Sequence, residues 1–314
     1  MMGLEKKLLQ VSVKRNLMEL RNAPTDYMCA QYRWWFKMKT ERLNKNNRPL
    51  VEKAIKEAIK VNPLNEDFLS EYDSKSFVMK FLLKSSFDIY ISNDSVGYIW
   101  YEHLSNNVFN IKSLYFPPNF SELPISFFTK NHSYSYESIA NEDSISLLKA
   151  LDFNIYSESY ILEKTIEDFS FNDIEDISFR YVKTKDDINA RVTLQNIIFD
   201  EDSRVPLETT DILFDMKQEY YINDLAIIMY FKDKAIGYGQ IIKNNTYTVV
   251  NFGILPEYRG QGLGRHFLNY IISLAKTKKI KELSIRVSPN NVKAMNLYNS
   301  VGFYFKEHIL TWNK

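Results

Sequence analysis

Hydrophobic residues in the second half of the chain change from a strand-like to a helix-like spacing around one short turn. The run Thr248 to Leu255 is rich in β-branched and aromatic residues and is closed by Pro256, which predicts a strand. In the run Phe267 to Ala275 the apolar residues recur every three or four positions, which predicts an amphipathic helix. The residues between them, Arg259 to Gly264, read Arg-Gly-Gln-Gly-Leu-Gly. The sequence therefore predicts a strand, a glycine-rich turn and a helix in succession.

The same spacing rules predict further elements on both sides of this turn. The acidic stretch 165–177 predicts a linker, and a polar loop is predicted between the two helices that follow it. Predicted strands are 179–182, 225–231, 235–242 and 283–287, and predicted helices are 185–199, 210–219 and one that follows Asn291.

Residues 1 to about 75 predict helices, because they contain little glycine and many strong helix formers. Within Pro49 to Val61 the apolar residues share one face and the charged residues the other. The adjacent aromatic residues Trp34, Trp35 and Phe36 suit either core packing or the lining of a pocket. After this region the predicted strands are 77–83, 87–91, 96–101 and 108–116, with a turn at Asn93-Asp94.

Two segments far apart in the chain share one pattern, which predicts a tandem repeat. The tails that follow them, 156–164 and 304–314, are also similar. We therefore expect two domains, 1–168 with the helical N-terminus and 177–314. The matching positions are Asn141, Ser144, Leu147, Leu148 and Phe153 in the first copy, and Asn291, Ala294, Leu297, Tyr298 and Phe303 in the second.

The glycine-rich turn predicts a site for a phosphate group. Glycine lets the backbone approach a ligand closely, and the unpaired N–H groups of a first helical turn attract an anion. The turn does not fit a P-loop, because no Lys-Ser or Lys-Thr follows Gly264. It does not fit the dinucleotide fingerprint either, because Arg265 stands where the last glycine is needed.

This turn and the segment downstream of it resemble the acetyl-CoA-binding turn and the following helix of the GCN5-related N-acetyltransferases (GNAT). The resemblance implies an α/β (α+β) fold of two tandem GNAT-like folds, each a mixed, mostly antiparallel sheet flanked by helices, with extra N-terminal helices. It also implies acetyl-CoA as the acyl donor. The motifs that carry it are Arg259-x-x-Gly262-x-Gly264 after Pro256-Glu257-Tyr258, and Asn291-x-x-Ala294-x-x-Leu297-Tyr298-x-x-x-Gly302-Phe303.

The resemblance further implies how acetyl-CoA would be held. Backbone N–H groups of the turn bind the pyrophosphate, and a backbone N–H near Ile254 or Leu255 polarises the thioester carbonyl. The strand is expected to splay from its neighbour so that the pantetheine arm pairs with it. Asn291 contacts this arm, caps the next helix, or does both. The implied cofactor-binding residues are Ile254, Leu255, Arg259, Gly260, Gln261, Gly262, Leu263, Gly264, Arg265 and Asn291.

Tyr298 is the predicted general acid. Its phenol suits the transfer of a proton to a departing thiolate, and the family commonly has tyrosine there; a tyrosine in a helical Leu-Tyr pair also suits core packing. No general base is evident, because the predicted strand 248–255 has no carboxylate. Asn251 could hold a water in that role. The acidic loop Asp200, Glu201 and Asp202 could attract a cationic amine, or could be a solvated surface loop.

The first copy is expected to lack a working cofactor site. Its counterpart of the turn, Pro117 to Glu122, has neither glycine nor arginine, and Leu148 stands where the second copy has Tyr298. We expect a degenerate copy that either shapes the acceptor side or supports the fold.

The composition of the chain argues against binding to nucleic acid, membranes or metals. A net charge of +1 gives no overall attraction to nucleic acid or to an anionic membrane, and no signal peptide or bilayer span is evident. The single cysteine, Cys29, and four scattered histidines predict no metal site. We expect a cytoplasmic monomer or homodimer.

The sequence predicts an enzyme, an N-acetyltransferase that is active in its second copy and acts on a primary amine of a small molecule or peptide. One alternative is a non-catalytic acyl-CoA-binding or interaction module, favoured by the missing carboxylate. A second alternative is a tandem ligase that depends on aminoacyl-tRNA, which the intact glycine turn argues against. The acceptor itself is not predicted, because acceptor specificity in this fold depends on variable loops.

Overall fold

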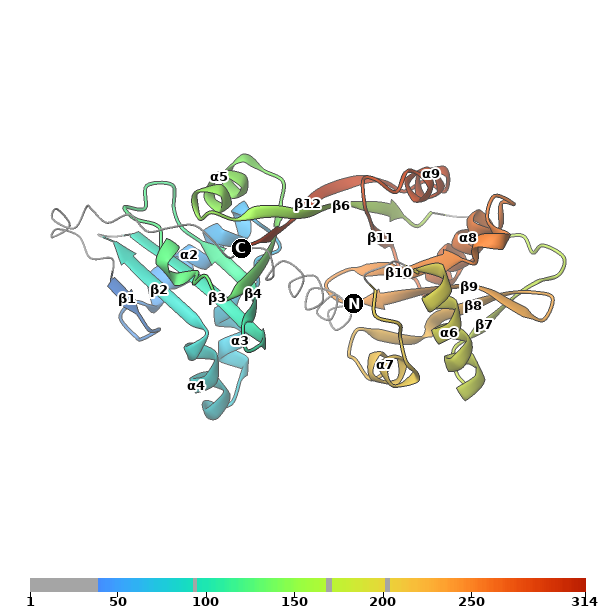
Figure 1. Cartoon of the computed structure of the whole chain (residues 1–314), viewed down its shortest axis with the longest axis horizontal. Coiled ribbons are helices and arrows are strands. Elements are labelled where there is room, and N and C mark those ends of the chain that lie inside the picture. Colours follow the sequence, from blue (N-terminus) through green and yellow to red (C-terminus); the bar gives the residue numbers. More distant parts are fainter. Residues whose placement is uncertain (1–38, 93–94, 168–170, 201–203) are drawn as a thin grey trace, which may run out of the picture. The chain divides into compact units, whose positions relative to one another are not determined.

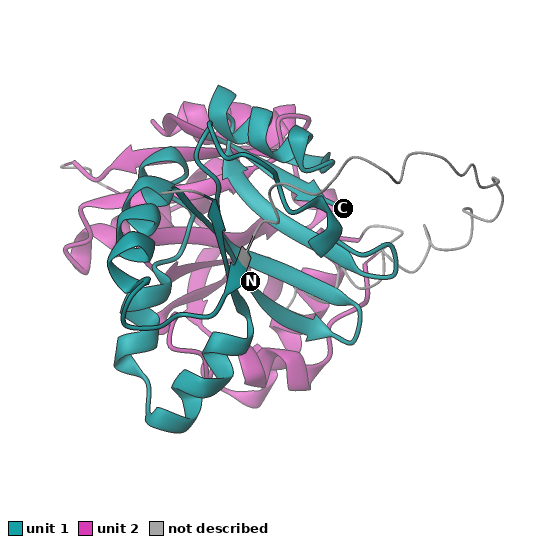
Figure 2. Cartoon of the chain, turned by 90° about the vertical axis from the view of Figure 1, so that its left-hand side faces the viewer, with its two compact units in different colours: residues 1–158, 308–314 teal, residues 159–307 magenta. Residues whose placement is uncertain are grey.

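A computed structural model describes residues 39–92, 95–167, 171–200 and 204–314. The predictions made for Trp34, Trp35 and Phe36 and for the Asn93-Asp94 turn lie outside these residues. The described chain forms two compact units, which are coloured separately in Figure 2. Unit 1 contains the described residues up to Glu158 together with His308–Lys314, and unit 2 contains Ser159–Glu307.

Unit 1 is built on a sheet with the strand order β1-β2-β3-β4-β5-β12 (Figure 1). Neighbouring strands run antiparallel except β4 and β5, which are parallel. Its strands are β1 (Lys39–Glu41), β2 (Phe87–Ser92), β3 (Ser95–Ser105), β4 (Val108–Tyr115), β5 (Ser133–Ile139) and part of β12 (Tyr304–Asn313), and its helices are α2 (Arg48–Val61), α3 (Phe68–Ser74), α4 (Phe77–Ser85), the 3-10 helix η1 (Ile125–Phe127) and α5 (Glu142–Ala150).

Unit 2 is built on a sheet with the strand order β6-β11-β10-β9-β8-β7. Here β10 and β11 are the parallel pair, and the other neighbours are antiparallel. Its strands are part of β6 (Asn154–Thr165), β7 (Ile177–Tyr181), β8 (Tyr221–Phe231), β9 (Lys234–Lys243), β10 (Tyr247–Ile254) and β11 (Glu282–Val287), and its helices are α6 (Lys185–Ile198), α7 (Thr209–Asp215), η2 (Pro256–Tyr258), α8 (Leu263–Thr277) and α9 (Val292–Ser300).

Each compact unit is completed by the last strand of the other sequence copy. In unit 2, residues 160–165 of β6 pair with β11. In unit 1, residues 309–313 of β12 pair with β5. The predicted domains 1–168 and 177–314 therefore describe sequence copies, and the compact units divide the chain at different positions.

The two copies begin their last helix in the same way. Asn141 caps α5 by accepting a hydrogen bond from the backbone N–H of Ser144 at 2.7 Å. Asn291 caps α9 through the N–H of Ala294 at 3.1 Å. An Asn side chain that satisfies a free N–H of the first turn stabilises a helix N-terminus. The shared asparagine of the repeat thus has a structural role in both copies, and the N-cap prediction for Asn291 is confirmed.

The predicted strand 77–83 is wrong, because these residues form the helix α4. An apolar run of this length does not by itself distinguish a strand from a helix. Residues without branching at Cβ, such as Met79, Leu82 and Lys84, favour a helix. None of the residues of α4 is buried, and the side chain of Phe81 is 75% exposed.

Two further boundaries differ from the predictions. The strand β1 lies inside the region predicted as helical, because its three residues pair with β2 from Ile89 to Ile91. The helix α7 ends at Asp215, earlier than the predicted Glu219. The pairing of β1 with the distant β2 is a tertiary contact, which overrides local propensity in so short a segment.

The sheet of unit 1 has a core on each face. Residues of α2 such as Val51 and Ile55 pack with Phe87 and Trp100, whereas Leu148 of α5 packs with Ile99 on the other face. In unit 2, α8 buries its apolar face, including Phe267 and Ile271, against the sheet. No helix in the described part of the chain has both the length and the apolar character needed to cross a bilayer.

Candidate active site

The strands β10 and β11 separate within unit 2. Their parallel pairing joins Thr248 to Ser284 and Val249 to Ile285, after which β10 continues to Ile254 without further pairing to β11. A β-bulge between Val250 and Gly253 interrupts the pairing of β10 with β9. The C-terminal end of β10 therefore keeps a partner strand on one edge and has an open edge on the other, as expected from the sequence.

Ile254 presents its backbone N–H to this open edge. The N–H of Leu255 donates to the carbonyl oxygen of Ile236 on β9 at 2.8 Å. Because successive N–H groups of a strand point to opposite edges, the N–H of Ile254 points away from β9. The sequence predicted that the N–H of either Ile254 or Leu255 donates to a thioester carbonyl. The N–H of Leu255 does not fit that role, because it already has a partner. The N–H of Ile254 fits it.

The glycine-rich turn connects β10 to the N-terminus of α8. Gly260 and Gly262 have φ angles of +79° and +80°, in the left-handed region that glycine adopts without strain. An added Cβ at either residue would meet no atom within 4 Å, so the backbone angle, and not a lack of space, requires glycine here. The turn is exposed, which leaves it open to a ligand.

The first turn of α8 offers backbone N–H groups that have no partner in the part of the chain that the structure describes. The first backbone hydrogen bond of this helix runs from the N–H of His266 to the carbonyl oxygen of Gly262, at 3.1 Å. The N–H groups of Leu263, Gly264 and Arg265 precede it, and the first turn has no acidic residue that would compete for them. Backbone donors at the positive end of the helix dipole are suited to bind phosphate oxygens.

The side chains of the turn mainly hold its backbone. Arg259 donates from Nε to the carbonyl oxygen of Ile254 at 3.0 Å and from Nη2 to that of Ile198 at 3.3 Å. Gln261 donates from Nε2 to the carbonyl oxygen of Glu257 at 3.3 Å. Arg259 thus joins the turn to the ends of β10 and α6. This explains an arginine at the start of the motif without a contact to an anion.

Tyr298 lies on α9 beside β10. Its ring contacts Phe252 and Phe303, with ring centroids 6.3 and 6.2 Å away, and only 7% of the residue is exposed. Burial raises the pKa of Tyr298 to about 12, and no hydrogen bond of its hydroxyl is found among the described residues. Tyr298 therefore packs in the core, as the core-packing interpretation expected. It also keeps its proton at neutral pH, which a general acid requires.

Two of the four residues predicted for the acceptor side, Asn251 and Asp200, lie among the described residues. Asn251 has φ +53° in the β-bulge of β10, a conformation that asparagine tolerates better than most residues. Asp200 is exposed just after α6. Glu201 and Asp202 lie outside the described residues. Among the residues that the structure covers, no group of His, Cys, Asp and Glu side chains could hold a metal ion.

A buried polar network between α6, α7 and β9 was missed in the sequence. Arg191 is 1% exposed and donates to Asp215 at 2.5 Å and to Gln195 at 2.9 Å. Its guanidinium also lies over the ring of Tyr238, 4.8 Å from the centroid. The signal was present, since Arg191 and Gln195 are four positions apart on the apolar face of the predicted helix. The network fixes α7 against α6.

Unit 1 also separates its parallel strands, but its own chain fills the gap. The pairing of β4 with β5 ends at Asn110 and Ser135. Beyond it, the N–H of Leu114 donates to Oδ1 of Asn65 at 3.0 Å, and the N–H of Ile139 donates to Oδ1 of Asn62 at 3.2 Å. The segment between α2 and α3 thus occupies the open edges of both strands.

Residues 193–303, which include the β10–α8 turn and α9, match the acetyltransferase (GNAT) family. This match assigns the segment 193–303 to the GNAT family of acetyltransferases. The chain is thereby an acyltransferase of the N-acetyltransferase type, and proteins of that type are similar to it in sequence. The spermine/spermidine N(1)-acetyltransferase of Bacillus subtilis (strain 168) is 27% identical over 128 residues, which cover 38% of this chain and 79% of that protein. The [ribosomal protein bS18]-alanine N-acetyltransferase of Escherichia coli (strain K12) is 31% identical over 85 residues, which cover 27% of this chain and 56% of that protein.

Solved structures show that the GNAT fold extends over most of the chain. A GCN5-related N-acetyltransferase from Sphaerobacter thermophilus superposes with a TM-score of 0.65 at 13% identity, over 88% of this chain and 95% of that one. A tandem GNAT protein from the clavulanic acid biosynthesis pathway superposes with a TM-score of 0.57 at 10% identity, over 88% and 98%. The predicted fold class, two tandem GNAT-like folds, is confirmed.

Proposed function

We propose that this GNAT protein transfers an acetyl group from acetyl-CoA to a primary amine of a small molecule or peptide, and that unit 2 carries the reaction. The observation that supports this most strongly is the open edge of β10, which ends at the glycine-rich turn of α8. One ligand that carries both an amide-rich arm and a pyrophosphate would use the two features together.

The turn fits the pyrophosphate of acetyl-CoA. The left-handed glycines leave space above the backbone, and the N–H groups of residues 261–265 would bind the phosphate oxygens. The pantetheine arm would lie along the open edge of β10 like an added strand. Asn291, at the start of α9, would contact the same arm. Acetyl-CoA supplies the activated acyl group, and the chain supplies its orientation.

Two groups of the chain would act on the reacting atoms. The N–H of Ile254 would donate to the thioester oxygen as negative charge develops there when the amine attacks. Tyr298 would give its proton to the leaving sulfur. A phenol with a pKa of about 12 is a weaker acid than a thiol in water, because the pKa of a cysteine thiol is about 8.5. The apolar surroundings that raise the pKa of Tyr298 would also raise that of the sulfur, which brings the two closer.

The attacking amine must also lose a proton. In our proposal water carries it away from the site, held by Asn251 or by the acidic loop Asp200, Glu201 and Asp202, which would also attract the cationic acceptor. The relatives named above are a polyamine acetyltransferase and a protein alanine acetyltransferase, which supports an amine as the acceptor class.

Unit 1 would contribute no second cofactor site. The open edges of β4 and β5 are already hydrogen-bonded to Asn65 and Asn62. A pantetheine arm would have to displace these bonds, which supports the proposal that the first copy is degenerate.

Release of free CoA from acetyl-CoA tests the proposed function. Spermidine, spermine and a peptide with an N-terminal alanine would serve as acceptors, with mass spectrometry of the products. We expect CoA release that depends on the amine and an acetylated product with at least one of them. Binding of acetyl-CoA without transfer to any amine of a broad panel would contradict the proposal and favour a non-catalytic module.

A further inference from the structure

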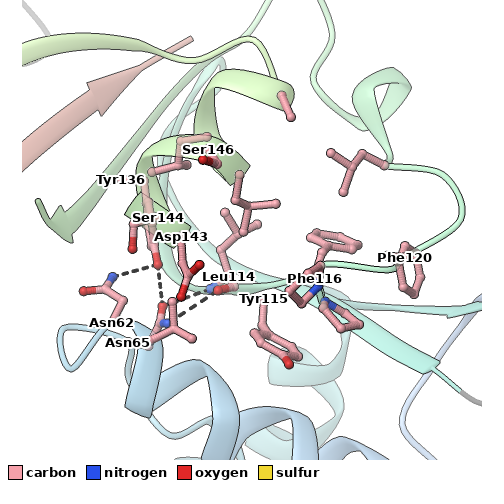
Figure 3. A pocket seen from close by; sticks show the side chains of 17 residues that line it. Asn62, Asn65, Leu114, Tyr115, Phe116, Phe120, Tyr136, Asp143, Ser144 and Ser146 are labelled. Carbon is pink, nitrogen blue, oxygen red and sulfur yellow. Dashed lines mark hydrogen bonds between the residues drawn. The ribbon is translucent and has the colours of Figure 1, made fainter. Parts of the chain in front are cut away.

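Unit 1 contains a cavity of about 340 Å³ between the end of β4, the loop that follows it and α5 (Figure 3). This volume falls within the range of about 300–1,000 Å³ that small-molecule sites occupy. The cavity is lined by Val61, Asn62, Asn65, Leu114, Tyr115, Phe116, Pro117, Pro118, Phe120, Leu123, Tyr136, Asp143, Ser144, Ser146, Leu147, Leu148 and Ala150.

The polar floor of the cavity is satisfied by its own hydrogen bonds. The hydroxyl of Tyr136 donates to Oδ1 of Asn65 at 2.7 Å and accepts from Nδ2 of Asn62 at 2.8 Å. Nδ2 of Asn65 donates in turn to the carbonyl oxygen of Ala58 at 2.9 Å. Figure 3 shows this chain of side chains on one side of the cavity. A ligand is therefore not needed to satisfy these groups, and a strongly polar ligand would have to compete with them.

The charge of the lining selects against anions. No lysine or arginine is among the lining residues, so a phosphate or carboxylate group would find no counter-ion there. Asp143 is the one carboxylate of the lining. It lies in the first turn of α5, where the positive end of the helix dipole offsets part of its charge. The charged side chains of the lining, one carboxylate and no lysine or arginine, nevertheless favour a cation.

The opposite wall is apolar. In Figure 3 Phe116 and Phe120 lie across the cavity from Asp143. Pro117 and Leu123 belong to the same segment of the lining, after β4. Burial of an apolar group against such a wall gains about 25 cal/mol per Å². The cavity thus pairs one carboxylate with an apolar surface that would take the body of a ligand.

We propose that this cavity binds a small organic ammonium ion, with its alkyl or aryl body against Phe116 and Phe120 and its charged nitrogen at Asp143. The site differs from the proposed acetyl-transfer site of unit 2, and its existence does not depend on catalysis. It would give the first copy a ligand class of its own in place of acetyl-CoA.

Calorimetric titration without acetyl-CoA tests this proposal with three probes of one shape: phenethylamine, 2-phenylethanol and 3-phenylpropanoate. At pH 7 we expect the ammonium ion to bind at least about tenfold more tightly than the neutral and the anionic probe, a difference equivalent to about 1.4 kcal/mol. Equal binding of the alcohol, or no binding of the amine by the folded protein, would overturn the proposal.

Variants place the binding in unit 1. Asp143→Asn should weaken phenethylamine binding about tenfold, whereas Glu142→Gln, an exposed neighbour in the same helical turn that does not line the cavity, should leave it unchanged. Ser146→Trp adds bulk at an exposed lining residue, so the variant should fold and lose binding. Binding that is unaffected by Asp143→Asn and by Ser146→Trp would assign the amine to another part of the chain and contradict the proposal.

Discussion

The backbone N–H of Leu114 donates to Oδ1 of Asn65 at 3.0 Å, in the gap where β4 parts from β5. The N–H of Ile254 faces the corresponding gap of unit 2, where β10 parts from β11. One fold therefore occurs twice with the same separation of strands. In one copy the separation is filled by a side chain, and in the other it is open.

Removal of the Asn65 side chain should destabilise unit 1. Asn65→Ala leaves the buried N–H of Leu114, the carbonyl oxygen of Ala58 and the hydroxyl of Tyr136 with fewer partners. Because each unsatisfied buried group costs about 1–3 kcal/mol, we expect a loss of about 2–4 kcal/mol in urea unfolding. Asn119→Ala, at an exposed loop position, is the control and should cost less than about 0.5 kcal/mol. Equal losses would contradict the role of Asn65.

Gly262 and Gly264 should differ in their tolerance of alanine. Gly262→Ala places a Cβ at φ +80°, which should cost about 1–2 kcal/mol. Gly264 is helical, and an added Cβ there would lie 3.5 Å from Leu297 in ordinary contact. Gly264→Ala should therefore leave stability unchanged or raise it by up to about 1 kcal/mol. The melting temperatures of the two variants test this order, and the reverse order would show that the turn has another conformation.

Replacement of Tyr298 by phenylalanine should separate catalysis from folding. Its hydroxyl has no partner among the described residues, so Tyr298→Phe should alter stability by less than about 0.5 kcal/mol and leave acetyl-CoA binding intact. Loss of a general acid should lower kcat about a hundredfold or more. An unchanged kcat in steady-state assays would leave Tyr298 with core packing alone.

The pH dependence gives a second test of Tyr298. The acid form is the active one, and its raised pKa of about 12 means that this form is lost only as pH rises through about 12. Between pH 7 and 10 the activity of the wild type should therefore not fall through ionisation of Tyr298. A fall in activity near pH 9 that is absent from Tyr298→Phe would mean that the phenol is far less buried in the working enzyme.

The buried pair of Arg191 and Asp215 should be critical for unit 2. Asp215→Asn leaves the guanidinium of Arg191, 1% exposed, without its carboxylate, which should cost about 3–5 kcal/mol. Asp224→Asn breaks the exposed pair with Lys278 and should cost about 0–1 kcal/mol, which makes it the matched control. Chemical denaturation of both variants measures the difference. Similar small losses would show that solvent reaches Arg191.

The glycine turn, the helix behind it and the tandem repeat could be predicted because each leaves a local pattern. The turn needs glycine at Gly260 and Gly262 for its backbone angles, and the repeat needs an asparagine to cap α5 and α9. Such requirements involve residues close together in the chain. They can be recognised without knowledge of the three-dimensional contacts.

Other features depend on residues that are distant in sequence. The filling of the β4–β5 gap needs Asn62 and Asn65 to meet Ile139 and Leu114, and no local pattern marks these pairs. The exchange of β6 and β12 between the units is likewise a question of pairing, because either strand would suit either sheet by composition. The helix α4 was misassigned because a short apolar run suits either a strand or a helix, and none of its residues is buried.

Calorimetric titration of acetyl-CoA is the most direct test of the central claim, that unit 2 holds the cofactor at the open edge of β10. The wild type should bind one acetyl-CoA per chain. Gly262→Trp, whose added side chain points into open space at the turn, should fold and bind none, whereas Lys278→Trp just after α8 should bind like the wild type. No binding by the folded wild type, or full binding by Gly262→Trp, would contradict the account.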